Sequence, residues 1–378
     1  MEEGCIMKIM EIIGEAEGGM KGHYISLVKG LKAEGAKVIT LCNFPKDDIR
    51  KLEAAGIQVK SFPFSRIIRP FLFLWKLMSL IYLIRMSDPH IIHCHGYKAG
   101  FLGRMAGWLS GMPITFVYTV HNFVTYGRGK IASWYIRLFE QWMGKKTQSI
   151  ICVSKALKTS LNEDIGIPEG KLHVIYNAVP NWPPGDGKPI REKYKIGDKE
   201  RVIGTVARLI PSKGIHVLLT AMSGVLFKYP NTKLLIVGSG PEENHLKKLS
   251  ESLGIARQTV FAAKVSNVQD YYAAFDIFVL PTLSEGLGIT ILEAMTYELP
   301  IVATSVGGIP EWLTHEKNAI LVPPNNVFAI RTALQSYLEN AELAEKHGRQ
   351  AKQDILARGI SEEEMVKQTW LVLKEAAL

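Results

Sequence analysis

Cysteine is scarce in this sequence, with four residues among 378, at positions 5, 42, 94 and 152. They are scattered, and each lies in or beside an apolar, strand-like run. This pattern excludes a small secreted domain that is held together by disulfides. The four cysteines are expected to be reduced side chains in the core of a cytosolic protein.

A long uncharged hydrophobic run is also missing. The most apolar segment, residues 66–86 (RIIRPFLFLWKLMSLIYLIRM), is divided by Lys76, and its uncharged runs are shorter than the roughly 20 residues of a membrane-spanning helix. Two interpretations stay open: a mostly buried helix, or a helix in a membrane interface with its basic ends on phosphate headgroups. No signal peptide is expected, because Glu2, Glu3 and Lys8 interrupt the first apolar run.

Negative charge is in the minority, because 45 lysines and arginines outnumber 36 aspartates and glutamates and give a formal charge of +9. This balance favours anionic partners such as nucleotides, phosphosugars or acidic lipid headgroups. The basic residues are dispersed and do not form one stripe with aromatic residues, so no nucleic-acid partner is expected. The chain is too long for a single hydrophobic core, which predicts two domains.

Apolar strand-like runs alternate with helical segments along most of the chain. The alternation predicts α/β domains whose parallel strands are joined by right-handed crossovers. It is interrupted at residues 177–189 (NAVPNWPPGDGKP), where four prolines and two glycines indicate a linker. We predict one Rossmann-like domain over residues 1–180 and a second over residues 190–360. A helix at about 361–378 is expected to pack back on the first domain.

Two doubly wound domains of this kind are predicted to face each other across a central cleft. Open parallel sheets bind ligands beyond the carboxyl ends of their strands. The functional site is therefore expected on loops that follow strands, such as those at Gly18, His95, His121, Arg208, Gly240 and Glu285.

The densest candidate site is the segment 283–295 (LSEGLGITILEAM), where a loop leads into a helix that begins near Gly288. Free backbone N–H groups at a helix start, with no Cβ at Gly286 or Gly288, can bind phosphate oxygens. Glu293 near the first turn suits a ribose diol, and Glu285 could reach the hydroxyls of a sugar beyond the phosphates. The spacing fits a nucleotide sugar, although an ordinary loop before a helix glutamate would look the same.

A second candidate lies in the segment 206–214 (VARLIPSKG), where Arg208 ends a strand and Lys213 precedes a helix. Two cations at this point could neutralise a departing diphosphate, since arginine offers a planar fork and lysine a point charge. Taken alone, the two residues fit solvated surface charges at least as well.

Three histidines mark strand ends in the first domain. The segment HIIHCHGYKAG (90–100) places His93 and His95 on one side of a strand, because strand side chains alternate. Polar contacts to a substrate or structural hydrogen bonds would explain them. A zinc pair finds no third ligand nearby in the sequence, so no metal is expected. His121, at the end of a strand in YTVHNF, is either structural or catalytic.

Several segments together resemble the retaining glycosyltransferases of family 4, which have the GT-B fold. They are GGMKGH in the first domain, and then ARLIPSKG, LLIVGSGPEENHL and FDIFVLPTLSEGLGITILEAMTYELPIVATSVGGIPEWL. The resemblance covers residues 8–322 and is strongest over 202–322, where the motifs follow the family's order. Two departures are mild: EGLG lacks the phenylalanine that often follows the first glycine, and YNAVP replaces a frequent asparagine–glycine turn.

The resemblance implies that the second domain binds a nucleotide-sugar donor. Glu285 would contact the donor sugar, Glu293 the nucleotide ribose, and Arg208 and Lys213 the diphosphate. Donor contacts are also implied for the N-terminal glycines Gly18 and Gly19, the helix-start residues Gly286, Leu287, Gly288 and Ile289, and Lys264 and Val265 beside the nucleobase.

The first domain would then bind the acceptor. His121 would lie close to the transferring sugar, with His95 and Tyr97 on the acceptor side. The expected catalytic set is therefore His121, Glu285, Arg208 and Lys213.

The resemblance implies a hexosyltransferase that moves a sugar from a UDP- or GDP-linked donor, with retention of the anomeric configuration, in polysaccharide or glycolipid biosynthesis. The acceptor would be a hydroxyl of a glycan, glycolipid or lipid-linked molecule, and no metal or other cofactor would be needed. Alternatives are a nucleotide-sugar epimerase, a phosphorylase on the same fold, or a non-catalytic nucleotide-sugar binding protein. The protein is expected in the cytoplasm, either free or peripheral on the anionic inner face of the membrane.

Overall fold

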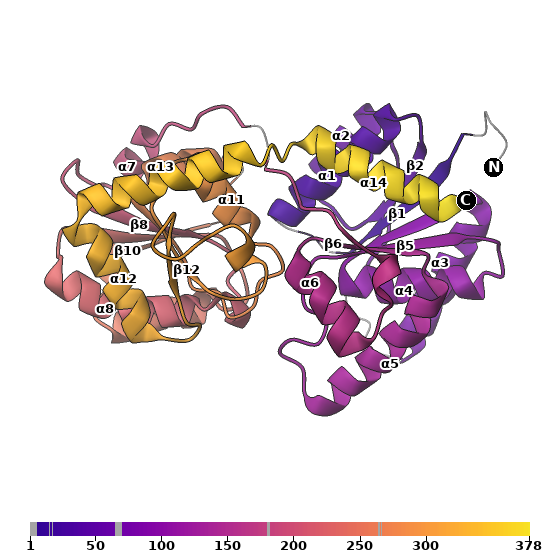
Figure 1. Ribbon diagram of the computed structural model, residues 1–378, viewed down its shortest axis with the longest axis horizontal. Coiled ribbons are helices and arrows are strands. Elements are labelled where there is room, and N and C mark those ends of the chain that lie inside the picture. The colour runs from indigo at the N-terminus through magenta and orange to yellow at the C-terminus, as the bar shows by residue number, and fades with distance from the viewer. Residues whose placement is uncertain are drawn as a thin grey trace. The chain divides into compact units, whose positions relative to one another are not determined.

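The chain folds into two compact units (Figure 1). A computed structural model describes residues 6–14, 16, 18–64, 70–179, 182–263, 265 and 267–378. Unit 1 comprises residues 1–178 together with 361–378, and unit 2 comprises residues 179–360. Unit 1 is therefore built from two separate parts of the chain, whereas unit 2 is one continuous stretch.

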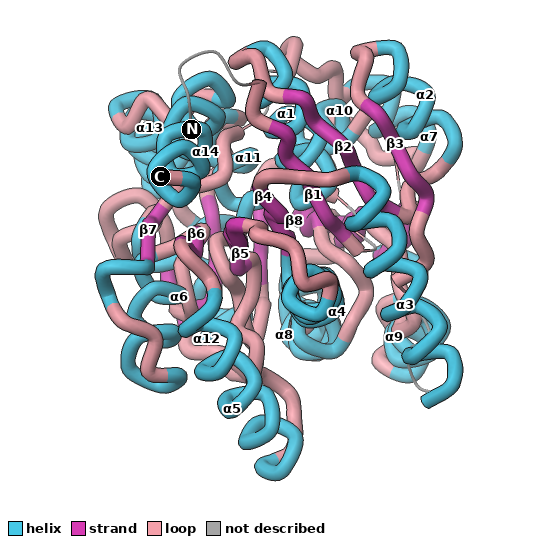
Figure 2. The backbone as a smooth tube through the Cα atoms, turned by 90° about the vertical axis from the view of Figure 1, so that its right-hand side faces the viewer, coloured by secondary structure: helices cyan, strands magenta, loops and turns pink. Residues whose placement is uncertain are grey.

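Unit 1 contains a parallel sheet of seven strands in the order β3-β2-β1-β4-β5-β6-β7 (Figure 2). The chain runs outward from β1 to β3 and then returns to the other side of β1. The reversal between β1 and β4 is a topological switch point, where such sheets bind ligands. The strands are β1 Lys8–Ile13, β2 Lys37–Cys42, β3 Gln58–Ser61, β4 Ile91–His95, β5 Thr115–Val120, β6 Ser149–Cys152 and β7 Leu172–Val174.

Helices cover both faces of this sheet. Helices α1, α2 and α14 lie on one face, and α3, α4, α5 and α6 lie on the other (Figures 1 and 2). The C-terminal helix α14 packs against α1, β5 and β6. The bounds are α1 Gly19–Ala33, α2 Lys46–Ala54, α3 Pro70–Ser87, α4 Gly96–Leu109, α5 Lys130–Lys146, α6 Lys155–Ser160 and α14 Glu362–Ala377.

Unit 2 repeats this architecture with six parallel strands in the order β10-β9-β8-β11-β12-β13. Its switch point lies between β8 and β11. The strands are β8 Arg201–Val206, β9 Thr232–Val237, β10 Thr259–Ala262, β11 Ile277–Leu280, β12 Ile301–Thr304 and β13 Ile320–Val322. The helices are α7 Lys188–Lys193, α8 Ile215–Lys228, α9 Glu243–Ser252, α10 Val268–Ala274, α11 Ile289–Thr296, α12 Val327–Glu339 and α13 Ala341–Ala357.

The core follows from the apolar strands. Strands covered by helices on both faces consist of nearly continuous apolar residues, and β9 (TKLLIV) and β11 (IFVL) show this pattern. The core of unit 2 joins such strands to the apolar faces of α8 and α12. The predicted α/β fold with two doubly wound sheets is therefore confirmed. The predicted linker is too long by two residues, because α7 begins at Lys188, with Pro189 in its first turn, where proline is tolerated.

Residues 70–86 of the apolar segment lie in helix α3, whereas residues 66–69, with Arg66 and Arg69, lie outside the described residues. Of the two interpretations, a mostly buried helix describes one face of α3 only, and contact with a membrane interface stays a prediction. That face buries Lys76, Leu77, Leu80, Ile81 and Ile84, whereas the other exposes Phe71, Leu74, Trp75, Met78, Tyr82 and Met86. Among the described residues, no helix is both long and apolar enough to cross a membrane.

The cysteines that the structure describes, Cys42, Cys94 and Cys152, are buried and form no disulfide with one another. They lie on β2, β4 and β6. Cys5 is outside the described residues.

Candidate functional site

The loops that follow β8 and β11 are neighbours at the carboxyl edge of the unit 2 sheet, because these two strands pair there. This edge is the switch point of unit 2, where a doubly wound sheet offers its ligand site. Lys213 lies in the first loop and Glu285 in the second. The topology therefore brings together two candidates that are 72 residues apart in the sequence.

Close backbone packing fixes the two loops against each other. Gly214 has a φ of 65°, and a Cβ at this position would lie 2.0 Å from the carbonyl oxygen of Pro281. The N–H of Leu283 and the hydroxyl of Thr282 both donate to the carbonyl of Ser212, at 2.7 and 3.0 Å. Only glycine permits both this left-handed conformation and this close approach.

Lys213 and Glu285 form an ion pair across the two loops. Lys213 Nζ donates to Glu285 Oε2 at 2.5 Å, and the two side chains are 18% and 11% exposed. The N–H of Gly308, in the loop after β12, donates to the backbone carbonyl of Glu285 at 3.3 Å. A lysine ammonium has three N–H donors, of which Glu285 accepts one. The pair therefore presents a cation and a carboxylate in fixed positions.

Helix α11 begins directly after the loop that carries Glu285. Gly288 has a φ of 84°, in the left-handed region that favours glycine, and Ile289 is the first helical residue. Gly286 and Leu287 are buried in the loop. Gly288 has no side chain that could cap this helix start, and the N–H of Ile291 donates to the Gly288 carbonyl at 2.8 Å, which leaves the N–H groups of Ile289 and Thr290 for an anion.

Glu293 lies in the second turn of α11 and is only 4% exposed. The hydroxyl of Tyr272, on α10, donates to Glu293 Oε2 at 2.6 Å. The Tyr272 ring stacks on that of Tyr297, with centroids 5.6 Å apart. Burial raises the pKa of Glu293 to about 7, and the hydrogen bond from Tyr272 opposes this shift only in part. Glu293 is thus a buried carboxyl that titrates near neutral pH.

The remaining predicted donor residues are more dispersed. Arg208 is exposed just after β8, and Val265 is partly buried after β10. Lys264 lies outside the described residues. Gly18 and Gly19 belong to unit 1, where Gly18, with a φ of 57°, immediately precedes α1. In unit 2, the structure brings together Lys213, Glu285 and the start of α11.

A buried carboxylate that the sequence analysis did not single out lies in the unit 1 sheet. Glu11 on β1 contacts two histidines of β4: its Oε1 is 3.0 Å from His93 Nδ1, and its Oε2 is 2.8 Å from His95 Nε2. Burial alone would raise the pKa of Glu11, but the two imidazoles outweigh it and lower this pKa to about 2. Glu11 is therefore an ionised carboxylate that accepts two hydrogen bonds.

His121 and His23 extend this cluster. His121 Nε2 lies 3.4 Å from His95 Nδ1, and the ring of His23, on α1, meets the His121 ring edge-on with centroids 5.5 Å apart. His23 Nδ1 is buried and has no hydrogen-bond partner in the described part of the chain. Burial lowers the pKa of His95 to about 4 and that of His23 to about 3, and it holds the pKa of His121 well below its usual value. These imidazoles are therefore neutral at pH 7.

Two overlapping sets in this cluster have the spacing of metal ligands: His23 with His95 and His121, and Glu11 with His93 and His95. In each set the ligand atoms lie within 4.8 Å of one another. The sequence shows no third ligand near His93 and His95 because the fold supplies these partners from α1, β1 and the end of β5. Hydrogen bonds already account for the facing atoms of Glu11, His93 and His95. The absence of a metal requirement stays a prediction.

The two predicted acceptor-side residues differ in their exposure. His95 is only 2% exposed and is bonded to Glu11. Tyr97, the second residue of α4, is partly exposed, and the guanidinium of Arg128 lies 4.5 Å from the centre of its ring. Of the two, Tyr97 is therefore the one that a ligand can reach at the surface.

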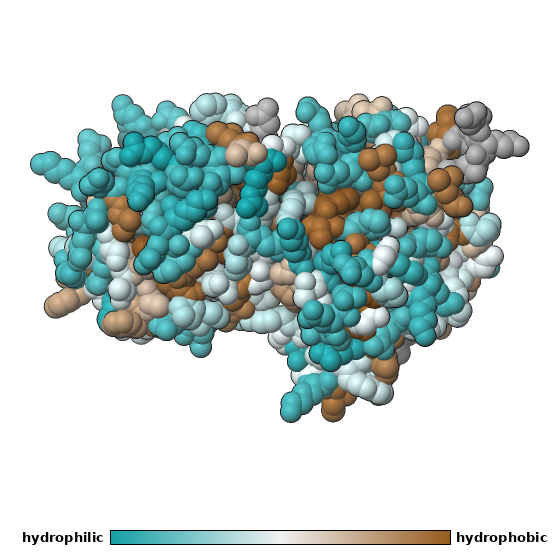
Figure 3. Space-filling model, in the orientation of Figure 1, coloured by the Kyte–Doolittle hydropathy of each residue, from teal (hydrophilic) through white to brown (hydrophobic). Residues whose placement is uncertain are grey.

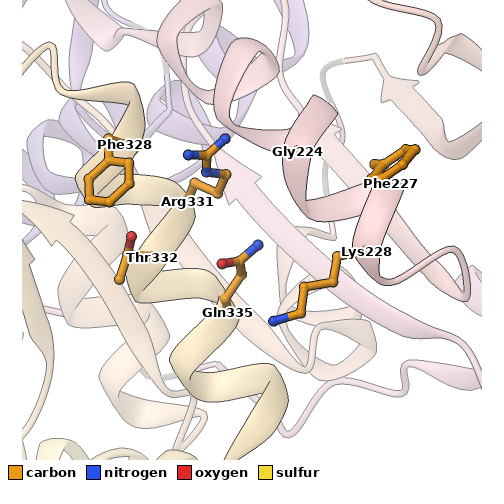
Figure 4. A pocket seen from close by; sticks show the side chains of 7 residues that line it. All are labelled: Gly224, Phe227, Lys228, Phe328, Arg331, Thr332 and Gln335. Atoms are coloured by element: carbon orange, nitrogen blue, oxygen red, sulfur yellow. The ribbon is translucent and has the colours of Figure 1, made fainter.

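A surface pocket of about 420 Å³ lies elsewhere in unit 2, between α8 and α12 (Figure 4). Phe328 and Phe227 flank its two ends in Figure 4, with Arg331 between them. The first α8 residue that lines the pocket is Gly224. It lies about 14 Å along the helix axis from the start of α8, which Lys213 and Gly214 precede. None of the predicted site residues lines this pocket, and it lacks a carboxylate. It is therefore separate from the candidate donor site.

Three residues of the candidate sites were missed from the sequence: Glu11, His23 and Tyr272. Glu11 could have been found, because a carboxylate inside the apolar run IMEII needs a buried partner. His23 and Tyr272 lie on helices with no local pattern that separates them from ordinary core residues.

Two doubly wound units, each with candidate residues near its switch point, are the architecture of the GT-B class of glycosyltransferases. The family model "Glycosyltransferase Family 4" matches residues 17–181, and "Glycosyl transferases group 1" matches residues 186–354. The chain therefore belongs to the family 4, group 1 glycosyltransferases.

Individual proteins support this assignment over nearly the full chain. An uncharacterized glycosyltransferase of Methanocaldococcus jannaschii is 28% identical over 376 residues, which cover 95% of both chains. The UDP-Gal:alpha-D-GlcNAc-diphosphoundecaprenol alpha-1,3-galactosyltransferase of Escherichia coli is 27% identical over 68% of this chain and 69% of its own. An Anabaena protein crystallised with UDP-glucose shares the fold, with a TM-score of 0.84 and 20% identity over 98% of this chain and all of that one.

Proposed function

We propose that the protein is a retaining hexosyltransferase that moves a sugar from a nucleotide-diphosphate donor to an acceptor hydroxyl. The observation that carries this proposal is the fixed Lys213–Glu285 pair beside the uncapped start of α11. A cation and a helix N-terminus suit a diphosphate, and a carboxylate suits the hydroxyls of the sugar attached to it. Glu293 would accept hydrogen bonds from the ribose hydroxyls at the other end of the same donor.

The proposed reaction is a substitution at the anomeric carbon on one face of the sugar. The bond from this carbon to the phosphate oxygen breaks, and a bond to the acceptor oxygen forms. The acceptor proton passes to the departing phosphate oxygen, so no side-chain base is needed. Arg208, Lys213 and the N–H groups of α11 would stabilise the negative charge that develops on the diphosphate. They would take the place of a divalent metal.

A UDP-sugar is the first donor to test. The Escherichia coli relative is named for a UDP-Gal donor, and the Anabaena structure contains UDP-glucose. These names concern those proteins, and a relative from Mycolicibacterium smegmatis, 33% identical over 42% of this chain, is named for GDP-mannose, so GDP donors are tested beside UDP donors. The Escherichia coli relative is named for a diphosphoundecaprenol-linked acceptor, which supports a lipid-linked acceptor.

Donor binding can be measured by thermal unfolding with UDP, GDP, UDP-glucose, UDP-galactose and GDP-mannose. A ligand at about 100 times its Kd should raise the Tm by about 5 °C, because it binds only the folded state. UMP is the matched control, since it has the base and ribose but no diphosphate, and its shift should be smaller. The best donor is then incubated with and without acceptor. No shift with any diphosphate, or conversion of the donor to its epimer without acceptor, would contradict the proposal.

An acceptor embedded in a membrane would require a surface that binds lipid, and the exposed face of α5 in unit 1 is our candidate for it. Figure 3 shows hydrophobic residues exposed where α5 lies. Helix α5 exposes Ile131, Trp134, Tyr135, Leu138 and Trp142. Its one acidic residue, Glu140, is buried in an ion pair with Arg104. The exposed charges of α5 and of the loop before it are all positive: Arg128, Lys130, Arg137 and Lys145. This chemistry suits an anionic lipid surface.

We expect the protein to sediment with vesicles of phosphatidylglycerol and phosphatidylcholine, and added salt should weaken the binding. Replacing Trp134 and Tyr135 together by serine should weaken it on the order of a hundredfold or more, because each large apolar side chain contributes roughly 1.5 kcal/mol or more when buried. The matched control is Phe227→Ser, which removes an aromatic residue that is 92% exposed in unit 2. Equal binding by all three proteins would rule out this surface.

A further inference from the structure

Glu11 fixes where two buried imidazoles carry their protons. In the pairing of β1 with β4, Glu11 lies opposite His93, and Ile13 lies opposite His95. Because side chains two residues apart on a strand point to the same face, Glu11, His93 and His95 all lie on one face of the sheet. An ionised carboxylate only accepts hydrogen bonds. The nitrogens that face it, His93 Nδ1 and His95 Nε2, must therefore both be N–H donors.

The proton positions then follow along the chain of contacts. A neutral imidazole has one N–H, so His95, which donates from Nε2, has a lone pair on Nδ1. His121 Nε2 lies 3.4 Å from His95 Nδ1 and must carry a proton to donate to the lone pair there. Neutral His121 is then left with a lone pair on Nδ1. This nitrogen makes no hydrogen bond within the part of the chain that the structure describes.

We infer that Glu11 is a positioning residue: through His95 it holds His121 in the tautomer that offers Nδ1 as an acceptor to a hydroxyl group of a bound sugar. The assignment of a sugar as the ligand rests on the proposed function, whereas the tautomer follows from the cluster itself. His121 could then neither donate a proton from Nδ1 nor act as a cation. Its role would be to orient a sugar hydroxyl and not to protonate a leaving group.

Two substitutions at Glu11 separate hydrogen bonding from charge. Glu11→Leu removes the acceptor, so that nothing fixes the proton of His95 and both tautomers of His121 become populated. Glu11→Gln removes the same charge but keeps a carbonyl oxygen for His95. Its amide group can face His93, which then moves its proton to Nε2 and donates to Thr119 Oγ1, at 2.8 Å. Glutamine should therefore preserve the His121 tautomer that leucine loses.

The direct test is ¹⁵N NMR of the histidine side chains in the full chain at pH 7, with the His121 signals assigned by their loss in His121→Gln. The wild type should show one neutral tautomer of His121, protonated on Nε2, before and after treatment with EDTA. Glu11→Gln should match it, and Glu11→Leu should show both tautomers. Thr119→Val is the matched control, since it alters the same buried cluster but leaves the Glu11–His95–His121 contacts intact; it should match the wild type.

Transfer kinetics supply the second readout. Glu11→Leu should lower sugar transfer on the order of tenfold, about the effect of one lost hydrogen bond, whereas Glu11→Gln and Thr119→Val should stay near wild type. A wild-type His121 protonated on Nδ1, one tautomer retained in Glu11→Leu, or mixed tautomers in Glu11→Gln would each overturn the inference. Histidine signals that shift on removal of metal by EDTA would also overturn it in favour of a metal site. A wild type that transfers no sugar would refute the proposed function but leave the tautomer result standing.

Discussion

Replacing Lys213 by alanine should lower the rate of sugar transfer by about 100- to 1000-fold, the usual effect of removing one group that stabilises developing negative charge. Lys213 is held in place by Glu285 at 2.5 Å, so its ammonium meets the diphosphate without rearrangement. The loss should appear mainly in kcat, because the charge on the leaving group grows as the bond breaks. Steady-state kinetics with the best donor measure both parameters.

The matched control for this prediction is Lys228→Ala. Lys228 lies at the opposite end of α8 and is also paired with a glutamate, Glu339, but at the surface. The Lys228→Ala variant should transfer sugar at the wild-type rate. Wild-type kcat in Lys213→Ala, with the folded state verified by its melting temperature, would show that the lysine does not stabilise the diphosphate.

Glu293→Gln should remove a pH dependence of the free energy of unfolding. The pKa of Glu293 is about 7 in the folded protein and has its ordinary value of 4.5 when exposed. Between these pH values the folded state holds a proton that the unfolded state releases. The contribution of Glu293 to the free energy of unfolding is therefore complete below pH 4.5 and is lost as the pH rises to 7. It amounts to on the order of 3 kcal/mol, and glutamine cannot titrate.

Urea unfolding of both proteins at pH 5 and at pH 7.5 tests this prediction. Relative to the wild type, Glu293→Gln should have a higher free energy of unfolding at pH 7.5 than at pH 5. The matched control is Glu298→Gln, which makes the same change at an exposed position just beyond the end of α11. A difference that stays constant between the two pH values would mean that the carboxyl of Glu293 titrates as it does in the unfolded chain.

The sequence predicts the fold well because its information on the fold is local. Each apolar run that precedes a helical segment corresponds to a strand of one of the two sheets, and glycine marks the turns that need it. Gly214 and Gly288 both have positive φ values, and both lie beside a predicted donor residue. Motif spacing therefore identifies the Lys213 loop and the Glu285 loop independently, and the switch-point topology explains why they meet.

Side-chain pairing could not be predicted in the same way. The sequence analysis placed Lys213 on a diphosphate and Glu285 on a sugar, whereas the structure pairs them with each other. The partner of Glu293, Tyr272, comes from another helix, 21 residues earlier. Glu11 and His95 are 84 residues apart, and only the pairing of β1 with β4 brings them together. Such contacts depend on register between distant segments, which no local pattern encodes.

The packing of α14 on unit 1 constrains the order in which a ribosome can complete the two units. Val366 of α14 sits directly over Gly30 of α1, where any Cβ would lie 2.4 Å from its methyl group, and Ser26 donates to Glu362 at 2.6 Å. This fitted surface of α1 is translated early, but its cover is translated after all of unit 2. A nascent chain therefore has to carry an uncovered face of unit 1 while unit 2 is made and folds. A polypeptide that ends before residue 361 would leave that face permanently exposed to chaperones or to aggregation.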